Sequence, residues 1–280
     1  MGRFCDIAVL TELRDTTGLA HEYISTILSS MQASAQKRGY DITFLSSYRQ
    51  NRQTALERCR ERGFDGVALV CMDFISPDVL QLAHSGIPCV SIDYVFPHCG
   101  SVLSDNESGM RELTEYVCEM GHQRVAYIAG DEGTVSRLRC ETFRQTMEGH
   151  DLPLPPEYYK RSLFHDEECS AQATRELLAL PERPTCIFYP DDISCLGGMR
   201  EIAAQGLRIP QDISVTGFDG IAAMQCRRPR LTTVRQNAAA IGEEAIRQLM
   251  AAIEAPETHE TRPVLIPGEL LKGETVARVN

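Results

Sequence analysis

Short apolar runs alternate with amphipathic segments along the N-terminal third of the chain. Phe4–Leu10 has the apolar character of a buried strand, and the apolar positions from Ile24 to Ala35 recur every three or four residues, as on one helix face. Glycine or proline stands at the ends of the predicted helices. Such an order predicts parallel strands joined by covering helices, because each connection crosses one face of the sheet. The predicted strands are 4–10, 41–45, 66–70 and 88–92, and the predicted helices are 21–38, 53–62 and 77–86.

The same alternation starts again near residue 101 and predicts a second lobe. Beyond Leu231 the pattern changes to the short strand LTTVRQ, a strongly amphipathic helix over 237–252 and a last extended segment, RPVLIPGELL. The predicted fold class is α/β, with two doubly wound parallel-sheet lobes. The predicted strands of this part are 101–104, 124–129, 158–164, 186–189 and 213–218, and its predicted helices are 106–120, 136–148, 167–179 and 192–204.

The stretch from Gly121 to Phe143 predicts a strand, a turn that faces a ligand, and a helix. Val125–Ala129 is apolar and is bounded by glycines, as a buried parallel strand is. Ser136 is expected to cap the helix, which leaves Arg139 close to the helix start. Because a cation is disfavoured at a helix N-terminus, this arginine indicates a partner outside the helix, the alternative being a solvated side chain.

Polar side chains follow the predicted strands, at the sheet edge where open α/β sheets bind ligands. Carboxylates accept hydrogen bonds from hydroxyl groups, arginine donates to oxygens, and an aromatic ring packs on an apolar face, so the set indicates a sugar or polyol site. A polyanionic ligand would be repelled by these acids. For Asp166 and Asp192 we favour the alternative that they cap helices. The set comprises Glu12, Asp15, 72–74, Asp93, Tyr94, 131–139, 164–166, Asp191, Asp192 and Asp219.

Composition excludes several classes of protein. With 280 residues, 43% hydrophobic and 24% charged, the chain has the make-up of one large domain or two average ones. No apolar run reaches the roughly 20 residues of a transmembrane helix, and the start MGRFCDIAVL lacks the apolar core of a secretion signal. Eleven cysteines without a CxxC pair indicate reduced thiols. We therefore expect a cytoplasmic protein that makes no membrane contact.

Charge and motifs limit the chemistry further. A net charge of −11 argues against nucleic-acid binding by this chain alone, since phosphate recognition needs concentrated lysine and arginine. The motifs GxGxxG, GxxxxGK[ST], GxSxG and HExxH are absent from the sequence. The cluster HDEEC at 165–169 is better explained as an acid-rich helix start than as a metal site. We expect no enzymatic activity, no metal and no cofactor.

Two groups of motifs stand out: GHQRVAYIAG followed by SRLRCETF, and PTCIFYPDDISCLGGMREIAAQGLRIPQDISVTGFDGI with LTTVRQNAAAIGEEAI. Together they resemble the effector-binding core of the lactose/galactose-repressor (LacI/GalR) family of bacterial transcription regulators. The similarity covers essentially the whole chain. It implies two periplasmic binding protein-like lobes joined by three crossover strands, and it implies a homodimer. The implied N-terminal lobe is 1–103 plus 236–263, and the implied C-terminal lobe is 104–235 plus 264–280.

The resemblance also implies which side chains bind a small-molecule effector in the cleft between the lobes. Asp191 stands where the family commonly has asparagine, so a more acidic and more hydroxyl-seeking site is expected. The family's helix-turn-helix headpiece would precede Phe4, so operator DNA is expected to be bound only through a headpiece that this chain lacks. The implied effector contacts are Glu12, Asp93, Arg139, Phe164, Asp191, Asp219 and Gln236.

A sugar-binding protein of a periplasmic transport system is the alternative function, because such proteins share this fold and binding chemistry. They normally carry a secretion signal and few cysteines, and this sequence shows neither feature. A headpiece or a signal peptide upstream in the native gene would distinguish the two functions. The identity of the effector stays open at this point.

Overall fold

The computed structural model describes residues 5–12, 21–46, 53–152, 154–255 and 262–279. The chain forms two compact units: unit 1 comprises Met1–Ser104 and Asn237–Ile266, and unit 2 comprises Asp105–Gln236 and Pro267–Asn280. The backbone therefore passes from one unit to the other three times. Two positions of the predicted pattern, Phe4 and Asp15, lie outside the described residues.

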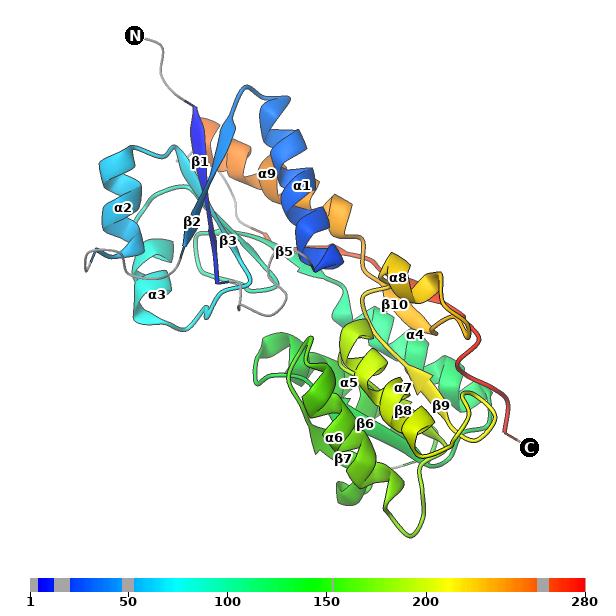
Figure 1. Ribbon diagram of the computed structural model, residues 1–280. Coiled ribbons are helices and arrows are strands. Elements are labelled where there is room, and N and C mark those ends of the chain that lie inside the picture. Colours follow the sequence, from blue (N-terminus) through cyan, green and yellow to red (C-terminus); the bar gives the residue numbers. More distant parts are fainter. Residues whose placement is uncertain (1–4, 13–20, 47–52, 153, 256–261, 280) are drawn as a thin grey trace. The chain divides into compact units, whose positions relative to one another are not determined.

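Unit 1 is built on a sheet of parallel strands in the order β11-β5-β4-β3-β1-β2 (Figure 1). The strands are β1 (Asp6–Thr11), β2 (Asp41–Ser46), β3 (Gly66–Val70), β4 (Cys89–Ile92), β5 (Gly100–Ser104) and β11 (Val264–Ile266). The helices are α1 (Glu22–Gln36), α2 (Ala55–Arg62), α3 (Pro77–Ala83) and α9 (Ala238–Glu254).

Helices cover both faces of this sheet, because successive residues of a strand point to opposite sides. Ile7 and Val9 of β1 are buried in one cluster with apolar residues of α1 and α9, which lie side by side (Figure 1). Ala8 and Leu10 of the same strand are buried in a second cluster with residues of α2 and α3. The strands are apolar on both sides for this reason, and polar side chains are left to the strand ends.

Unit 2 repeats the design with a parallel sheet in the order β7-β6-β8-β9 and a short antiparallel pair, β10 with β12. The strands are β6 (Val125–Ala129), β7 (Tyr159–Arg161), β8 (Cys186–Phe188), β9 (Ser214–Thr216), β10 (Thr233–Arg235) and β12 (Glu269–Leu271). The helices are α4 (Asn106–Glu119), α5 (Thr134–Gly149), α6 (Glu167–Leu178), α7 (Asp192–Ala204) and α8 (Ala222–Gln225), with a 3₁₀ turn at Pro156–Tyr158.

The two faces of this second sheet are again covered by different helices. Val125 and Tyr127 of β6 are buried with residues of α4 and α5, whereas Ala126 and Ile128 are buried with residues of α6 and α7. The α/β class with two parallel, doubly wound sheets is therefore confirmed. No disulfide bond joins any of the eleven cysteines, all of which lie among the described residues, and the reduced state of the thiols stays a prediction.

Two details of the predicted pattern are wrong. Ser136 does not cap α5: the helix begins at Thr134, and its N-cap is Gly133, whose extended backbone leads into the helix without a side-chain cap. The segment RPVLIPGELL is also not one continuous extended element. Pro267, which cannot donate a ladder hydrogen bond, separates β11 in unit 1 from β12 in unit 2.

Candidate functional site

Five of the predicted effector contacts belong to unit 2. The strands of its four-stranded sheet are parallel, so their C-terminal ends meet at one edge. Phe164, Asp191 and Asp219 follow β7, β8 and β9, respectively, and Arg139 lies in the second turn of α5, which follows β6. Gln236 follows β10. This edge is the position at which open α/β sheets bind ligands.

Arg139 is a buried cation with fixed partners outside its own helix. Its side chain is 4% exposed. Nε donates to Oδ1 of Asn106 at 2.7 Å, Nη1 donates to the carbonyl of Pro190 at 3.0 Å, and the guanidinium carbon lies 3.5 Å from the ring centroid of Phe218. Burying a cation is costly unless it is bonded in this way. A guanidinium carries five N–H groups. Because these bonds use only two of them, the others can donate to an oxygen of a ligand.

Phe164 is held beside Arg139 by a close approach of the backbone. A Cβ atom at Gly130 would lie 2.7 Å from Cε2 and Cζ of the Phe164 ring, so only glycine leaves room for the ring. The backbone N–H of Phe164 donates to Oδ2 of Asp131 at 3.4 Å, and the Arg139 guanidinium lies 5.9 Å from the ring centroid. The partly buried ring therefore presents an apolar surface next to the arginine.

Asp191 is buried, and both of its carboxylate oxygens accept hydrogen bonds within unit 2. As the N-cap of α7 it accepts from the backbone N–H and the hydroxyl of Ser194 at 2.8 and 2.7 Å, and it accepts from the N–H of His165 at 2.9 Å. Nδ1 of His165 lies 3.4 Å from Oδ1. Burial alone would raise the pKa of Asp191, but the bonds and charge of His165 hold the pKa below its usual value.

The same pair acts in the opposite direction on the histidine. Burial would lower the pKa of His165, but the carboxylate of Asp191 outweighs this effect, and the charge of Asp219 adds to it, so the pKa of His165 is raised. The protonated imidazole beside Asp191 is therefore favoured up to a higher pH than in an isolated histidine. Asp191 thus orients His165 and the start of α7, and its direct contact with an effector stays a prediction.

Asp219 and Gln236, two of the predicted contacts, are joined directly. Asp219 is 7% exposed and has a left-handed backbone with φ of 122°, and its Oδ1 accepts from Nε2 of Gln236 at 2.6 Å. Burial raises the pKa of Asp219 to about 7, against the opposing charges of His165 and Arg139. A carboxyl group with this pKa is present in both forms near neutral pH. It can therefore donate to or accept from a ligand hydroxyl.

The capping interpretation holds for only one of the two acids to which it was applied. Asp166 caps α6, accepting from the N–H of Cys169 at 2.9 Å. Asp192 lies inside α7, whose cap is Asp191, and the capping interpretation of Asp192 is therefore wrong. Its oxygens accept from the hydroxyl of Thr233 at 2.6 Å and the N–H of Ile221 at 2.8 Å. Burial and then the charge of Asp219 raise the pKa of Asp192 well above its ordinary value.

The other two predicted contacts, Asp93 and Glu12, belong to unit 1, after β4 and β1, the two neighbours of β3. Asp93 has a left-handed backbone with φ of 60°. Its Oδ1 accepts from the N–H of Ser104 at 2.9 Å, and Oδ2 accepts from the hydroxyl of Tyr23 at 3.2 Å. Glu12 is exposed, and its Oε2 accepts from the N–H of Asp73 at 3.4 Å.

Three aromatic rings lie at the same edge of the unit 1 sheet. Phe74 follows β3, and Tyr94 and Phe96 follow β4. The rings of Phe74 and Tyr94 stack with centroids 4.9 Å apart and planes at 13°, and Phe96 lies 4.6 Å from Tyr94. Phe96 is buried in the apolar cluster that includes residues of α2 and α3, and the partly buried rings of Phe74 and Tyr94 pack against that cluster.

Sequence reasoning did not assign several residues that shape these edges. Asn106 and Phe218 hold Arg139, and His165 was attributed to a helix start. Phe74 and Tyr94 were noted as residues after strands but were not predicted as effector contacts. The sequence could have indicated these residues by their position, because each one lies shortly after strand β3, β4, β5, β7 or β9. The fold brings the ends of these strands to the ligand-binding edges of the two sheets.

Comparisons with known proteins agree with this architecture. A family model described as a periplasmic binding protein-like domain matches residues 114–276. The chain is 34% identical over 220 residues to the protein named probable HTH-type transcriptional repressor ExuR of Bacillus subtilis (strain 168), covering 77% of this chain and 66% of that protein. It is 30% identical over 260 residues to the ribose operon repressor of Escherichia coli (strain K12), covering 90% and 78%, respectively.

A solved structure shows the same fold over nearly the full length. A LacI family transcriptional regulator from Enterococcus faecium, with bound ribose, matches with a TM-score of 0.83 and 22% identity, covering 98% of this chain and 100% of that one. Within the described ranges, no helix combines the length and the apolar composition that crossing a bilayer requires. The chain belongs to the LacI/GalR family of transcriptional regulators, and it forms their periplasmic binding protein-like core.

Proposed function

We propose that this chain is the sensor of a transcriptional regulator and binds an uncharged, hydroxyl-rich effector, a sugar or a polyol. The observation that carries the proposal is the set of side chains at the edge of the unit 2 sheet: a buried arginine, the acids Asp191 and Asp219, and the Phe164 ring. Carboxylates and guanidinium exchange hydrogen bonds with hydroxyl groups, and the ring packs on C–H groups. The ribose operon repressor and the ribose-bound regulator support this ligand class.

The proposed signal is a change in the conformational equilibrium of the two units. The proposed effector contacts are Arg139, Asp191, Asp219 and Gln236 in unit 2, and Asp93 and Glu12 in unit 1. Such a ligand shifts an equilibrium between conformations only by its differential affinity for them. In a homodimer that carries DNA-binding headpieces, this shift would change operator affinity through a coupling of roughly 1–3 kcal/mol. The proposal places the protein in the cytoplasm, and no bond is made or broken.

The relatives favour a regulator over the transport alternative. Both curated relatives are named as repressors, and their sequences match across most of this chain. The dimer surface is also a proposal. We propose α1 and α9 for this surface; because their apolar residues are buried against the unit 1 sheet, exposed residues of these helices would form the contact. Sedimentation equilibrium of the chain measures the dimer directly.

The effector site is tested by one substitution with a matched control. Thermal-shift screening against sugars, polyols, sugar acids and nucleosides identifies a ligand, since 100 times the dissociation constant adds about 2.7 kcal/mol. The affinity of the identified ligand is then measured by calorimetry for the wild type and for Arg139→Ala. The substitution removes the hydrogen bonds from the guanidinium to the ligand, worth roughly 1.5–3 kcal/mol each, and we expect binding to be lost. Arg111→Ala is the control, because Arg111 is an exposed arginine paired only with Glu107. Wild-type affinity in Arg139→Ala contradicts the proposed site.

A further inference from the structure

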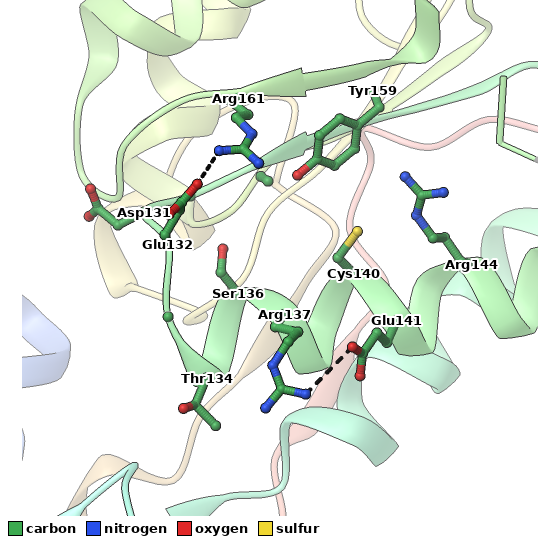
Figure 2. A pocket seen from close by; sticks show the side chains of 13 residues that line it. Asp131, Glu132, Thr134, Ser136, Arg137, Cys140, Glu141, Arg144, Tyr159 and Arg161 are labelled. Carbon is green, nitrogen blue, oxygen red and sulfur yellow. Dashed lines mark hydrogen bonds and ion pairs between the residues drawn. The ribbon is translucent and has the colours of Figure 1, made fainter. Parts of the chain in front are cut away.

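A cavity lies within unit 2, beside a face of α5 that does not include Arg139. It has a volume of about 570 Å³ and is bounded by the loop after β6, by one face of α5 and by the edge strand β7. Figure 2 shows Ser136 and Cys140 of α5 pointing toward Tyr159 and Arg161 of β7. Arg139, Phe164, Asp191 and Asp219 are not part of its lining. The volume falls in the range of roughly 300–1,000 Å³ that small-molecule sites have.

The cavity contains a polar group that the chain leaves unsatisfied. Ser136 is 8% exposed, and its hydroxyl oxygen has no hydrogen-bond partner in the described part of the chain. The hydroxyl points into the cavity (Figure 2). Buried hydroxyl groups are normally bonded, because an unbonded one has lost its water without a replacement. The same helix starts here without a side-chain cap and with no acid in its first turn, so its N-terminus adds positive potential.

The charged side chains that line the cavity differ in how they are paired. Three arginines and three acids line it. Arg161 is paired with Glu132, and Arg137 lies 3.5 Å from Glu141; all four of these side chains are at least half exposed. Exposed pairs contribute little and exchange readily with a ligand. The third acid, Asp131, accepts the backbone N–H of Phe164.

The third arginine, Arg144, has an aromatic ring and no acid as its partner. Its guanidinium carbon lies 5.4 Å from the ring centroid of Tyr159, and neither an ion pair nor a hydrogen bond joins it to the described residues. The ring of Tyr159 and the thiol of Cys140 supply the less polar part of the wall. The cavity therefore combines a free guanidinium, an unbonded hydroxyl and a helix N-terminus with an aromatic wall.

We propose that this cavity binds a small organic phosphate, a phosphate ester of a compact metabolite. The terminal oxygens of the phosphate would accept from the Ser136 hydroxyl and from the guanidinium groups of Arg161 and Arg144, with Arg161 exchanging Glu132 for the ligand. The organic body would lie against Tyr159 and Cys140. This ligand differs from the effector of Arg139 and the acids around it, because that acidic set disfavours a phosphate, whereas this cavity offers one arginine without an acidic partner and two arginines in exposed ion pairs.

The test is calorimetry on the whole chain with inorganic phosphate, glycerol 3-phosphate and glucose 6-phosphate. We expect an ester to bind at least about tenfold more tightly than inorganic phosphate, and we expect Ser136→Ala and Arg144→Gln each to weaken that ester by about tenfold. Neither change is expected to disturb folding, since alanine favours the helix and Arg144 is exposed. Circular dichroism verifies the fold, and Arg111→Gln on α4 is the matched control.

Three kinds of result would overturn the proposal. The first is that none of the three probes binds saturably at millimolar concentration. The second is unchanged affinity in both cavity variants, or esters that bind no better than inorganic phosphate, which leaves the organic body without a role. The third is loss of phosphate binding in Arg139→Ala, which assigns the phosphate to the effector site. Retained ester binding in Arg139→Ala supports the proposal, and this result is independent of whether any sugar binds.

Discussion

Replacing Asp219 with asparagine should stabilise the protein, by an amount that depends on pH. The side chain is 7% exposed, and burial raises its pKa to about 7 from the ordinary value of 3.8. Asparagine has the same shape, keeps an oxygen for the 2.6 Å bond from Gln236, and tolerates the left-handed backbone better than most residues. The substitution therefore removes the cost of holding a negative charge at this position, and it also removes the charge that helps to raise the pKa values of His165 and Asp192.

The sign and the size of the effect follow from the two pKa values. Below pH 3.8 the carboxyl group is protonated in both the folded and the unfolded chain. Between 3.8 and about 7 only the folded chain keeps the proton, so the stability of the wild type falls as the pH rises. Each unit of difference between the two pKa values corresponds to about 1.36 kcal/mol of unfolding free energy. Above pH 7 the charged carboxyl group therefore lowers the unfolding free energy of the wild type by about 4 kcal/mol. We expect Asp219→Asn to be more stable than the wild type by roughly 2–4 kcal/mol at about pH 8, and by less than about 0.5 kcal/mol at about pH 4.

Urea unfolding at a series of pH values measures this difference. The chain contains no tryptophan, so far-ultraviolet circular dichroism is the appropriate signal. Asp166→Asn is the matched control, because asparagine caps a helix as well as aspartate does and should change stability by no more than about 0.5 kcal/mol. A gain for Asp219→Asn that is the same at every pH, or a loss of stability at about pH 8, would refute the reasoning. Asp219→Asn should bind the effector more weakly than the wild type, because it lacks the carboxylate that we propose as an effector contact. In the wild type this carboxylate is kept although it lowers the stability of the fold.

Two glycines adjoining buried or partly buried rings give further predictions. In Gly130→Ala the new Cβ would lie 2.7 Å from Phe164, so the ring must move, and calorimetry should show effector affinity lower by about tenfold. In Gly198→Ala the Cβ would lie 2.0 Å from the Tyr189 hydroxyl, and urea unfolding should show a loss of about 1–3 kcal/mol. Gly149→Ala controls both experiments, because nothing lies within 4 Å of its Cβ, and it should be neutral or slightly stabilising; equal results for the three variants would contradict the packing argument.

The order of the elements was predictable from the sequence, and their ends were less so. The long helices α1 and α9 were predicted closely because their apolar residues repeat over several turns. The strand predicted at 158–164 is β7, which covers only Tyr159–Arg161. The 3₁₀ turn and the four-residue helix α8 were not predicted, since periodicity cannot show in a single turn. The start of α5 was misplaced because Gly133 begins the helix without the side-chain cap that the pattern requires.

The candidate site was predictable to the extent that strand ends identify it. Carboxylates directly after strands gave Asp93, Asp191 and Asp219, and the resemblance added Gln236. The partners of these groups were not predictable, because they depend on contacts between distant segments. Arg139 meets Asn106 and Pro190 only in the folded sheet, and the pKa of Asp219 is set by burial that no local pattern shows.

The position of α9 has a consequence for biosynthesis. Its residues Ile241, Ala245 and Leu249 belong to the same buried cluster as Ile7 of the first strand. The ribosome makes β1 before Asp105–Gln236 and makes α9 only after that segment, so a nascent chain cannot close this face of the unit 1 sheet until α9 has emerged. The interval leaves β-branched and other large apolar side chains of β1, β3 and β4 open to water, and during translation this surface is the one that chaperones would have to shield.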